Sequence, residues 1–209
     1  MGERVLLAHG SPDARHGAAL RRLARDVGAR LGCAVRHATL DDALPTGAHV
    51  LPLLLTEGRH GRCDAPASIA RAAATRVDGP AERPAEIADL LLAEVQRVRA
   101  RQRAVMFVVY RFDLAESLVA ELYRVSKQFP LPAIAAVHGG CDVASVLALW
   151  RAEGVRDVLI QPALLFPGIT LDALRAQAAC PEMCVHVGTP LYASQAFVAW
   201  IARRFKEET

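Results

Sequence analysis

The sequence lacks long apolar runs, a strong excess of one charge and an abundance of aromatic residues. No uncharged apolar stretch approaches ~18 residues, the length that suggests a membrane-spanning helix, and only 5% of the residues are aromatic. The formal net charge of +3 is spread along the chain, so a sequence pI of about 8.7 gives little support for a nucleic-acid partner. We therefore expect a protein that neither crosses a membrane nor binds nucleic acid.

The sequence also lacks the cysteine patterns and short motifs of several protein classes. Its five cysteines are an odd number, and the apolar run Val5–Ala8 is too short for a secretory leader, so we expect reduced thiols in a cytoplasmic protein. Cys180 and Cys184 lack the Cys-x-x-Cys spacing, which argues against an iron–sulfur cluster. P-loop, Gly-x-Gly-x-x-Gly and Gly-x-Ser-x-Gly motifs are missing, which argues against nucleotide-dependent enzymes and serine hydrolases.

What the sequence does contain is an α/β pattern with ample core-forming material. Hydrophobic residues make up 53% of the chain, and short Val- and Leu-rich runs alternate with helix-period segments, as expected for βα units on a parallel sheet. In the first half this predicts strands over 5–8, 34–39, 49–55 and 73–77, and helices over 15–31, 65–71 and 84–101. In the second half it predicts strands over 105–109, 133–137, 158–165 and 183–187, and helices over 113–127, 142–152, near 171 and over 193–205.

The same order of elements thus occurs twice, which indicates an internal duplication. Val5 matches Val105 at an offset of 100, and Pro52 matches Pro162 at an offset of 110. Such constant offsets within blocks are typical of a repeated unit.

From this duplication we predict two similar halves, 1–102 and 103–209. Each half is expected to be a four-stranded parallel, flavodoxin-like sheet flanked by helices. The two halves are expected to face each other across a cleft in a monomer with internal pseudo-symmetry.

Two histidines follow expected strands of the first half. His9 comes directly after Val5–Ala8, and His60 lies just beyond the run Val50–Leu55. Because ligands in open α/β sheets bind at the carboxyl ends of the strands, these side chains should face each other if the strand order is 2-1-3-4. Imidazole suits Fe²⁺, Co²⁺, Ni²⁺ and Zn²⁺. The sequence therefore predicts a two-histidine metal site with open coordination positions.

The segments around these histidines resemble the class II chelatases, which insert cobalt, iron or sometimes nickel into sirohydrochlorin. The resemblance rests on Leu-Leu-Ala-His9-Gly10-Ser11, on Leu-Pro-Leu-Leu-Leu-Thr-Glu57-Gly-Arg59-His60, and on Asp64-Ala-Pro that follows. It covers the first half closely and the second half only in outline, through Ile160–Gly168. The resemblance implies ATP-independent insertion of Co²⁺, Fe²⁺ or Ni²⁺ into an anionic tetrapyrrole, with no further cofactor. It also implies that His9 and His60 bind the metal and help to remove the pyrrole protons.

Further residues near the two motifs are candidates for the same site. Glu57 could support His60 or relay protons, or be a solvated loop glutamate. Because sirohydrochlorin is a polycarboxylate, nearby cations and a helix N-terminus could bind it. The candidates for this role are Gly10, Ser11, Arg15, Arg59 and Arg62, and each arginine could instead be an ordinary surface charge. Asp13 is expected to cap the first helix.

The second half carries one further candidate site residue, His138. His60-Gly-Arg-Cys63-Asp64 and His138-Gly-Gly-Cys141-Asp142 share one pattern, so His138 could be a third ligand, a proton acceptor or a substrate contact. The simpler alternative is that His138 packs locally and that Cys63 and Cys141 are small buried side chains.

Register places Val109 where His9 stands and Thr170 where His60 stands, so we expect a single metal site in the first half. The remaining histidines are expected to be structural, namely His16, His37, His49 and His186.

Two other functions fit parts of the sequence. A histidine phosphatase would use Arg59-His60-Gly61 as its nucleophile motif and His138 as its second histidine, but it leaves His9 unexplained. A metal or tetrapyrrole carrier without catalytic activity would keep both His9 and His60.

Overall fold

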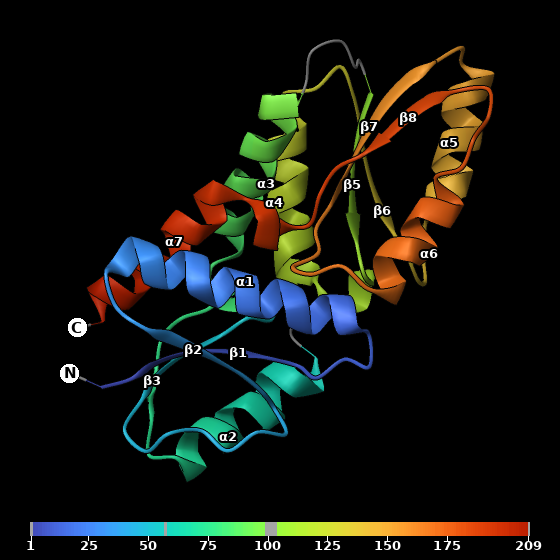
Figure 1. The fold of residues 1–209 in the computed structure, drawn as a ribbon. Coiled ribbons are helices and arrows are strands. Elements are labelled where there is room, and N and C mark those ends of the chain that lie inside the picture. Colours follow the sequence, from blue (N-terminus) through green and yellow to red (C-terminus); the bar gives the residue numbers. More distant parts are fainter. Residues whose placement is uncertain (1, 57, 99–103, 209) are drawn as a thin grey trace. The chain divides into compact units, whose positions relative to one another are not determined.

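The computed structural model describes residues 2–56, 58–98 and 104–208, which form two four-stranded sheets (Figure 1). The strands of the first sheet are β1 (Arg4–Ala8), β2 (Val35–Thr39), β3 (His49–Pro52) and β4 (Thr75–Arg76), in the order β2-β1-β3-β4. Those of the second are β5 (Ala104–Val109), β6 (Leu131–Ala136), β7 (Asp157–Pro162) and β8 (Cys184–Val187), in the order β6-β5-β7-β8. All these pairings are parallel, which confirms the predicted α/β class and the 2-1-3-4 order.

The helices of each half flank the sheets. In the first half they are α1 (Ala14–Leu31), α2 (Ala65–Arg71), which a π-helical turn over His60–Asp64 precedes, and α3 (Pro84–Val98). In the second half they are α4 (Glu116–Ser126), α5 (Val143–Ala152), α6 (Ile169–Gln177) and α7 (Gln195–Glu207). Within the described residues, no helix combines the length and apolarity needed to cross a membrane.

The central strands explain the apolar runs of the sequence. All five residues of β1 and all six of β5 are buried, as expected where helices cover both faces of a parallel sheet. Asp13 caps α1 as predicted, because its carboxylate accepts a hydrogen bond of 2.9 Å from the backbone N–H of Arg15.

Several expected boundaries shift for local reasons. Strand β4 has two residues instead of the five expected, because Ala73 has a left-handed φ of 46° in the turn after α2. The helix expected over 113–127 begins only at Glu116, after a 3-10 turn over Phe112–Leu114. Asp113 lies in that turn and binds Arg111, so it does not cap a helix as Asp13 does.

The hydrogen-bond ladder corrects the predicted register between the halves. The backbone N–H of Leu53 donates to Leu7 at 2.7 Å, and that of Ala163 donates to Val108 at 2.8 Å. Each donor follows the proline that ends its strand, so Leu7 corresponds to Val108 and the offset at this point is 101, not 100. The counterpart of His9 is therefore Tyr110.

The boundary expected between 102 and 103 lies outside the described residues. The chain forms two compact units, which we call unit 1 (Met1–Arg83 with Tyr192–Thr209) and unit 2 (Pro84–Leu191). Helix α3 packs against α4 and β7 within unit 2, whereas α7 packs along α1 within unit 1 (Figure 1). Each repeat therefore contributes its last helix to the unit built mainly from the other repeat.

Buried groups hold α7 in unit 1. Phe197 and Phe205 are fully buried, and the Arg204 side chain, 6% exposed, lies 3.5 Å from the Asp78 carboxylate in the segment after β4. A buried charge of this kind needs its partner to offset desolvation.

We expect Phe205→Ala to destabilise the protein by about 3–5 kcal/mol, because it leaves a large cavity beneath α7. Denaturant unfolding followed by circular dichroism measures this change. The control Lys206→Ala, at an exposed position of the same helix, should stay within about 0.5 kcal/mol of the parent chain. Equal stability of the two variants would contradict the packing of α7 in unit 1.

Candidate functional site

The structure brings together the two histidines that the sequence singled out. His9 follows β1 directly, and His60 begins the π-helical turn after β3, the strand that pairs with β1. Their ring centroids lie 6.2 Å apart and their planes differ by 13°. Two imidazoles on one metal ion, each bound at about 2 Å, have centroids roughly 5–6 Å apart. The separation of the two rings is thus close to that of two imidazoles on one ion.

One hydrogen bond of His9 determines which ring nitrogen is available to bind a metal ion or a proton. Its Nδ1 lies 2.8 Å from the carbonyl oxygen of Gly10. Because a carbonyl only accepts, Nδ1–H is the donor and Nε2 keeps its lone pair. Gly10 thus acts through its backbone, and Nε2 of His9 is the atom that can bind a metal ion or a proton.

His60 is oriented by a carboxylate on its own turn. Its Nδ1 lies 2.8 Å from Oδ2 of Asp64, four residues later, and the Arg59 Nε lies 3.6 Å from the other carboxylate oxygen. A carboxylate on one imidazole nitrogen sets the tautomer and makes the other nitrogen a better ligand. Glu57, the carboxylate predicted for this role, lies outside the described residues, and the signal for Asp64 was its i+4 spacing from His60.

His16, which the sequence indicated to be structural, lies beside the pair. It is buried on α1, and its ring centroid is 4.9 Å from that of His9. Burial, together with the nearby His9, lowers the pKa of His16 below its ordinary value, so the ring is neutral near pH 7. A buried neutral ring at this distance supports the position of His9.

The remaining predicted contacts surround this pair in unit 1. Arg15 binds the Asp13 carboxylate at 2.6 Å and, by this hydrogen bond, holds the pKa of Asp13 at about 2. Ser11 accepts a 3.2 Å hydrogen bond from the backbone N–H of Asp13, so Ser11, Asp13 and Arg15 organise the start of α1. Arg59 and Arg62 are exposed on the turn that carries His60.

The repeated pattern His-Gly-x-Cys-Asp has different structures in the two halves. Asp64 binds His60, whereas Asp142 caps α5 by accepting from the backbone N–H of Ser145 at 2.7 Å. His138 lies in unit 2, where its ring packs edge-on against Tyr110 with centroids 5.2 Å apart.

All five cysteines are free, as expected. Cys63 and Cys141 are exposed, so the expectation that they fill buried space is wrong. Among the residues that the structure describes, His, Cys, Asp and Glu side chains form no group of three or more suited to a metal ion. The pair His9 and His60 remains the candidate for metal binding, with two protein ligands.

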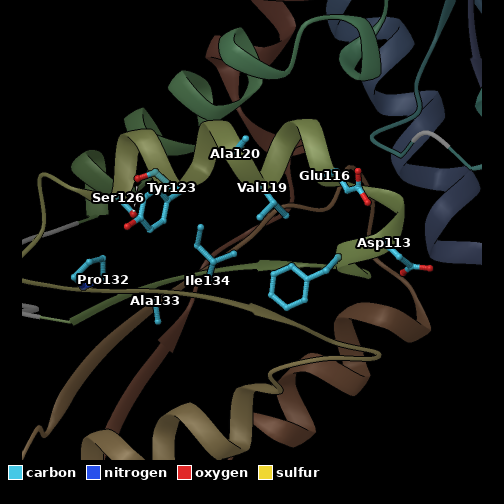
Figure 2. Close-up of a pocket in the computed structure, with 10 residues that line it drawn as sticks. Asp113, Glu116, Val119, Ala120, Tyr123, Ser126, Pro132, Ala133 and Ile134 are labelled. Atoms are coloured by element: carbon cyan, nitrogen blue, oxygen red, sulfur yellow. Dashed lines mark hydrogen bonds between the residues drawn. The ribbon is translucent and has the colours of Figure 1, made fainter.

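A cavity of about 900 Å³ lies in unit 2 between α4 and the edge strand β6. Figure 2 shows Val119 and Tyr123 pointing from α4 toward Ile134 on β6. The wall of this cavity is mostly apolar, with Asp113 and Glu116 among its lining residues, and it includes none of the predicted site residues.

The fold of this chain is similar to that of several solved structures. The chain superposes on CbiX, described as the terminal enzyme for biosynthesis of siroheme in denitrifying bacteria, with a TM-score of 0.74, 18% identity and 99% of each chain covered. It superposes on SirB from Bacillus subtilis with Fe³⁺ with a TM-score of 0.75, 15% identity and coverage of 99% of this chain and 95% of SirB. The fold is that of the chelatases. The resemblance read from the sequence is thus confirmed at the level of the fold.

A third structure extends the comparison. DR2241 from Deinococcus radiodurans, a multi-domain protein with structural similarity to chelatases, matches with a TM-score of 0.73 and 16% identity over 97% of this chain and 55% of its own. No protein-family model matches the chain, and neither does any curated protein sequence. The likeness to these chelatase structures therefore lies in the fold, and the roles of individual residues rest on the geometry of unit 1.

We expect His9→Ala and His60→Ala each to weaken Co²⁺ binding by about 10-fold or more, because either change leaves a single imidazole at the site. Calorimetric titration of the metal into the full chain measures the affinity. His186→Ala, which removes an exposed histidine from β8, is the matched control and should bind as the parent does. Undiminished affinity in both site variants would place the metal elsewhere.

Proposed function

We propose that this protein inserts Co²⁺ or Fe²⁺ into sirohydrochlorin or a related tetrapyrrole without using a nucleotide. The observation that carries the proposal is the pair of histidine rings 6.2 Å apart at the carboxyl ends of adjacent strands, on the fold of the chelatases. The metal ion is a substrate in this reaction, together with the metal-free macrocycle. The products are the metallated macrocycle and two protons.

The hydrogen bonds of the two histidines suit both the binding of the metal ion and the removal of the pyrrole protons. With Nδ1 of His9 donating to a carbonyl and Nδ1 of His60 donating to Asp64, each Nε2 presents a lone pair that can hold the incoming ion. When the ion moves to the pyrrole nitrogens, both lone pairs become available again. Neutral imidazole is a proton acceptor near pH 7. Each histidine can thus release the metal and take one pyrrole proton. The two protons replace the 2+ charge of the metal ion that leaves the histidines.

Charge near the pair suits an anionic substrate. Arg59 and Arg62 lie exposed on the turn of His60, where they can pair with carboxylates of the tetrapyrrole. Arg15 is bound to Asp13, and Arg59 lies near the Asp64 carboxylate. Two imidazoles discriminate weakly between first-row metals, which is why the proposal covers both Co²⁺ and Fe²⁺.

The proposal is tested by an anaerobic assay in which the absorption change of sirohydrochlorin on metallation is followed with Co²⁺ or Fe²⁺. The parent chain should accelerate metallation, and His9→Ala or His60→Ala should reduce the rate by about 10²–10⁴-fold, the usual contribution of positioned acid–base groups. Metal and tetrapyrrole binding with no acceleration would favour a carrier. Hydrolysis of a phosphomonoester that depends on His60 would favour a phosphatase instead.

We expect Asp64→Asn to lower the metallation rate about 10-fold or more, because the substitution removes the charge that orients and polarises His60. Asp142→Asn is the matched control from the same sequence pattern. Asn caps helices as well as Asp does, so this variant should retain the parent rate. Equal rates for the two variants would show that Asp64 has no part in the reaction.

A further inference from the structure

Helix α4 of unit 2 has two chemically different faces. Its buried face consists of Leu118, Leu122 and Val125. On the opposite side, residues spaced by four, three and four positions form an exposed row, which we call the outer stripe: Glu116, Ala120, Tyr123 and Lys127. Lys127 directly follows α4 and keeps helical backbone angles (φ −57°, ψ −18°), so it continues this row. Because residues three or four positions apart are neighbours on a helix surface, the outer stripe is continuous.

The middle of the outer stripe is apolar. Tyr123 is 62% exposed, and Ala120 lines the cavity between α4 and β6. Figure 2 shows Val119 pointing from α4 toward Ile134 on β6, so the wall of the cavity extends the apolar surface from the helix to the edge of the sheet. Exposed apolar surface bordered by charged residues is typical of a protein–protein contact.

The charges at the two ends of the outer stripe differ from those beside it. Next to the stripe, Arg124 binds the Glu121 carboxylate at 2.6 Å. Within the described residues, by contrast, neither Glu116 nor Lys127 forms an ion pair. The Lys127 ammonium lies over the Tyr123 ring, 5.1 Å from its centroid. The outer stripe thus begins with a negative charge and ends with a positive one, and both can take a partner from another chain.

The edge strand β6 does not offer a second chain a ladder of hydrogen bonds. The backbone N–H of Ala136 points away from β5, because it donates to the Cys141 carbonyl oxygen at 3.0 Å. Alternate residues of a parallel strand face the same side, so Ile134 and Pro132 also face outward. Proline has no N–H to donate, which leaves the backbone of Ile134 with both groups directed outward. A partner at this surface therefore binds through side chains and not as an added strand.

The outer stripe is complementary to itself. Glu116 and Lys127 have the same midpoint along the helix as Ala120 and Tyr123 do. A twofold axis through this point places Glu116 of one copy opposite Lys127 of the other. The same axis places the large Tyr123 ring opposite the small Ala120 side chain. We propose that two copies of this chain associate in this way, with their α4 helices antiparallel and their outer stripes in contact.

Known rules of helix packing support this contact and indicate its strength. A large side chain on one helix packs into the space above a small one on its neighbour, and the twofold axis repeats both the Tyr123–Ala120 contact and the ion pair. Helix α4 has 11 residues, about three turns, so the contact is smaller than the roughly 1,200–2,000 Å² of a stable interface. We therefore expect a weak dimer with a Kd of about 10–100 µM, where the duplication alone had predicted a monomer.

The test is sedimentation equilibrium of the full chain at protein concentrations from about 1 to 500 µM. Tyr123→Ala should weaken the dimer by about 10-fold or more, because it removes an aromatic ring from both contacts. Glu116→Lys and Lys127→Glu should each weaken it by about 5-fold or more, because each change sets like charges opposite one another. The double variant Glu116→Lys with Lys127→Glu restores opposite charges and should recover most of the parent affinity.

Matched controls separate the outer stripe from general effects of charge and apolar surface. Leu149→Ala removes another exposed large hydrophobic side chain from unit 2, on α5, and Lys206→Glu makes the same charge change at an exposed position of α7. Both should dimerise as the parent does. Thermal unfolding followed by circular dichroism checks that every variant is folded at the temperature of the measurement.

Three results would overturn the inference. A parent chain that stays monomeric at every concentration would mean that the outer stripe serves a small ligand or a different protein. A dimer that persists in Tyr123→Ala and Glu116→Lys would mean that the copies meet elsewhere. Single charge reversals that weaken the dimer without recovery in the double variant would contradict the antiparallel alignment. The outer stripe contains none of the proposed site residues, so each of these results leaves the metallation proposal as it stands.

Discussion

The candidate site depends on the parallel pairing of β1 with β3. This pairing sets Leu7 opposite Pro52, and the hydrogen bond from Leu53 to Leu7 continues it past the end of the strand. The chain leaves β1 at His9 and leaves β3 toward His60, so the two imidazoles meet only because these strands are neighbours with this register. A shift of one residue in a strand would turn its side chains to the opposite face of the sheet. The proximity of His9 and His60, on which the proposed metal chemistry depends, is therefore a consequence of how two buried apolar strands pair.

The duplication produces two sheets with equivalent carboxyl edges, and the residues at these edges make different contacts in the two repeats. In unit 1, the Asp of His-Gly-x-Cys-Asp binds a histidine, and in unit 2 it caps a helix. A single shared pattern thus leads to an oriented imidazole in one repeat and to an ordinary helix start in the other. The packing of α3 in unit 2 and of α7 in unit 1 makes each unit depend on residues from both repeats, so neither repeat alone contains a complete set of covering helices.

The sequence was sufficient to predict the features that depend on local pattern. Alternating apolar runs and helix-period segments gave the parallel strands, the strand order and the proximity of His9 and His60, because these follow from general rules of α/β folds. Two features depend on tertiary contacts that spacing does not encode. The burial of His16 beside His9 and the packing of α7 on α1 arise from side chains that meet across elements, whereas the contact of Asp64 with His60 follows from their i,i+4 spacing. The register of β5 was misplaced by one residue because Val5 and Val105 match in a run of similar apolar residues, and only the hydrogen-bond ladder identifies Tyr110 as the counterpart of His9.

The central claim is that His9 and His60 hold one divalent ion together and that unit 2 holds none. X-ray absorption spectroscopy of the Co²⁺-loaded full chain, combined with its metal-to-protein ratio, tests this claim most directly. In the parent chain the structure predicts one ion per chain, with the scattering of two imidazoles. In His9→Ala or His60→Ala, loaded at high Co²⁺ concentration, it predicts the scattering of one imidazole. Two ions per chain, or a single imidazole on the ion in the parent protein, would contradict it.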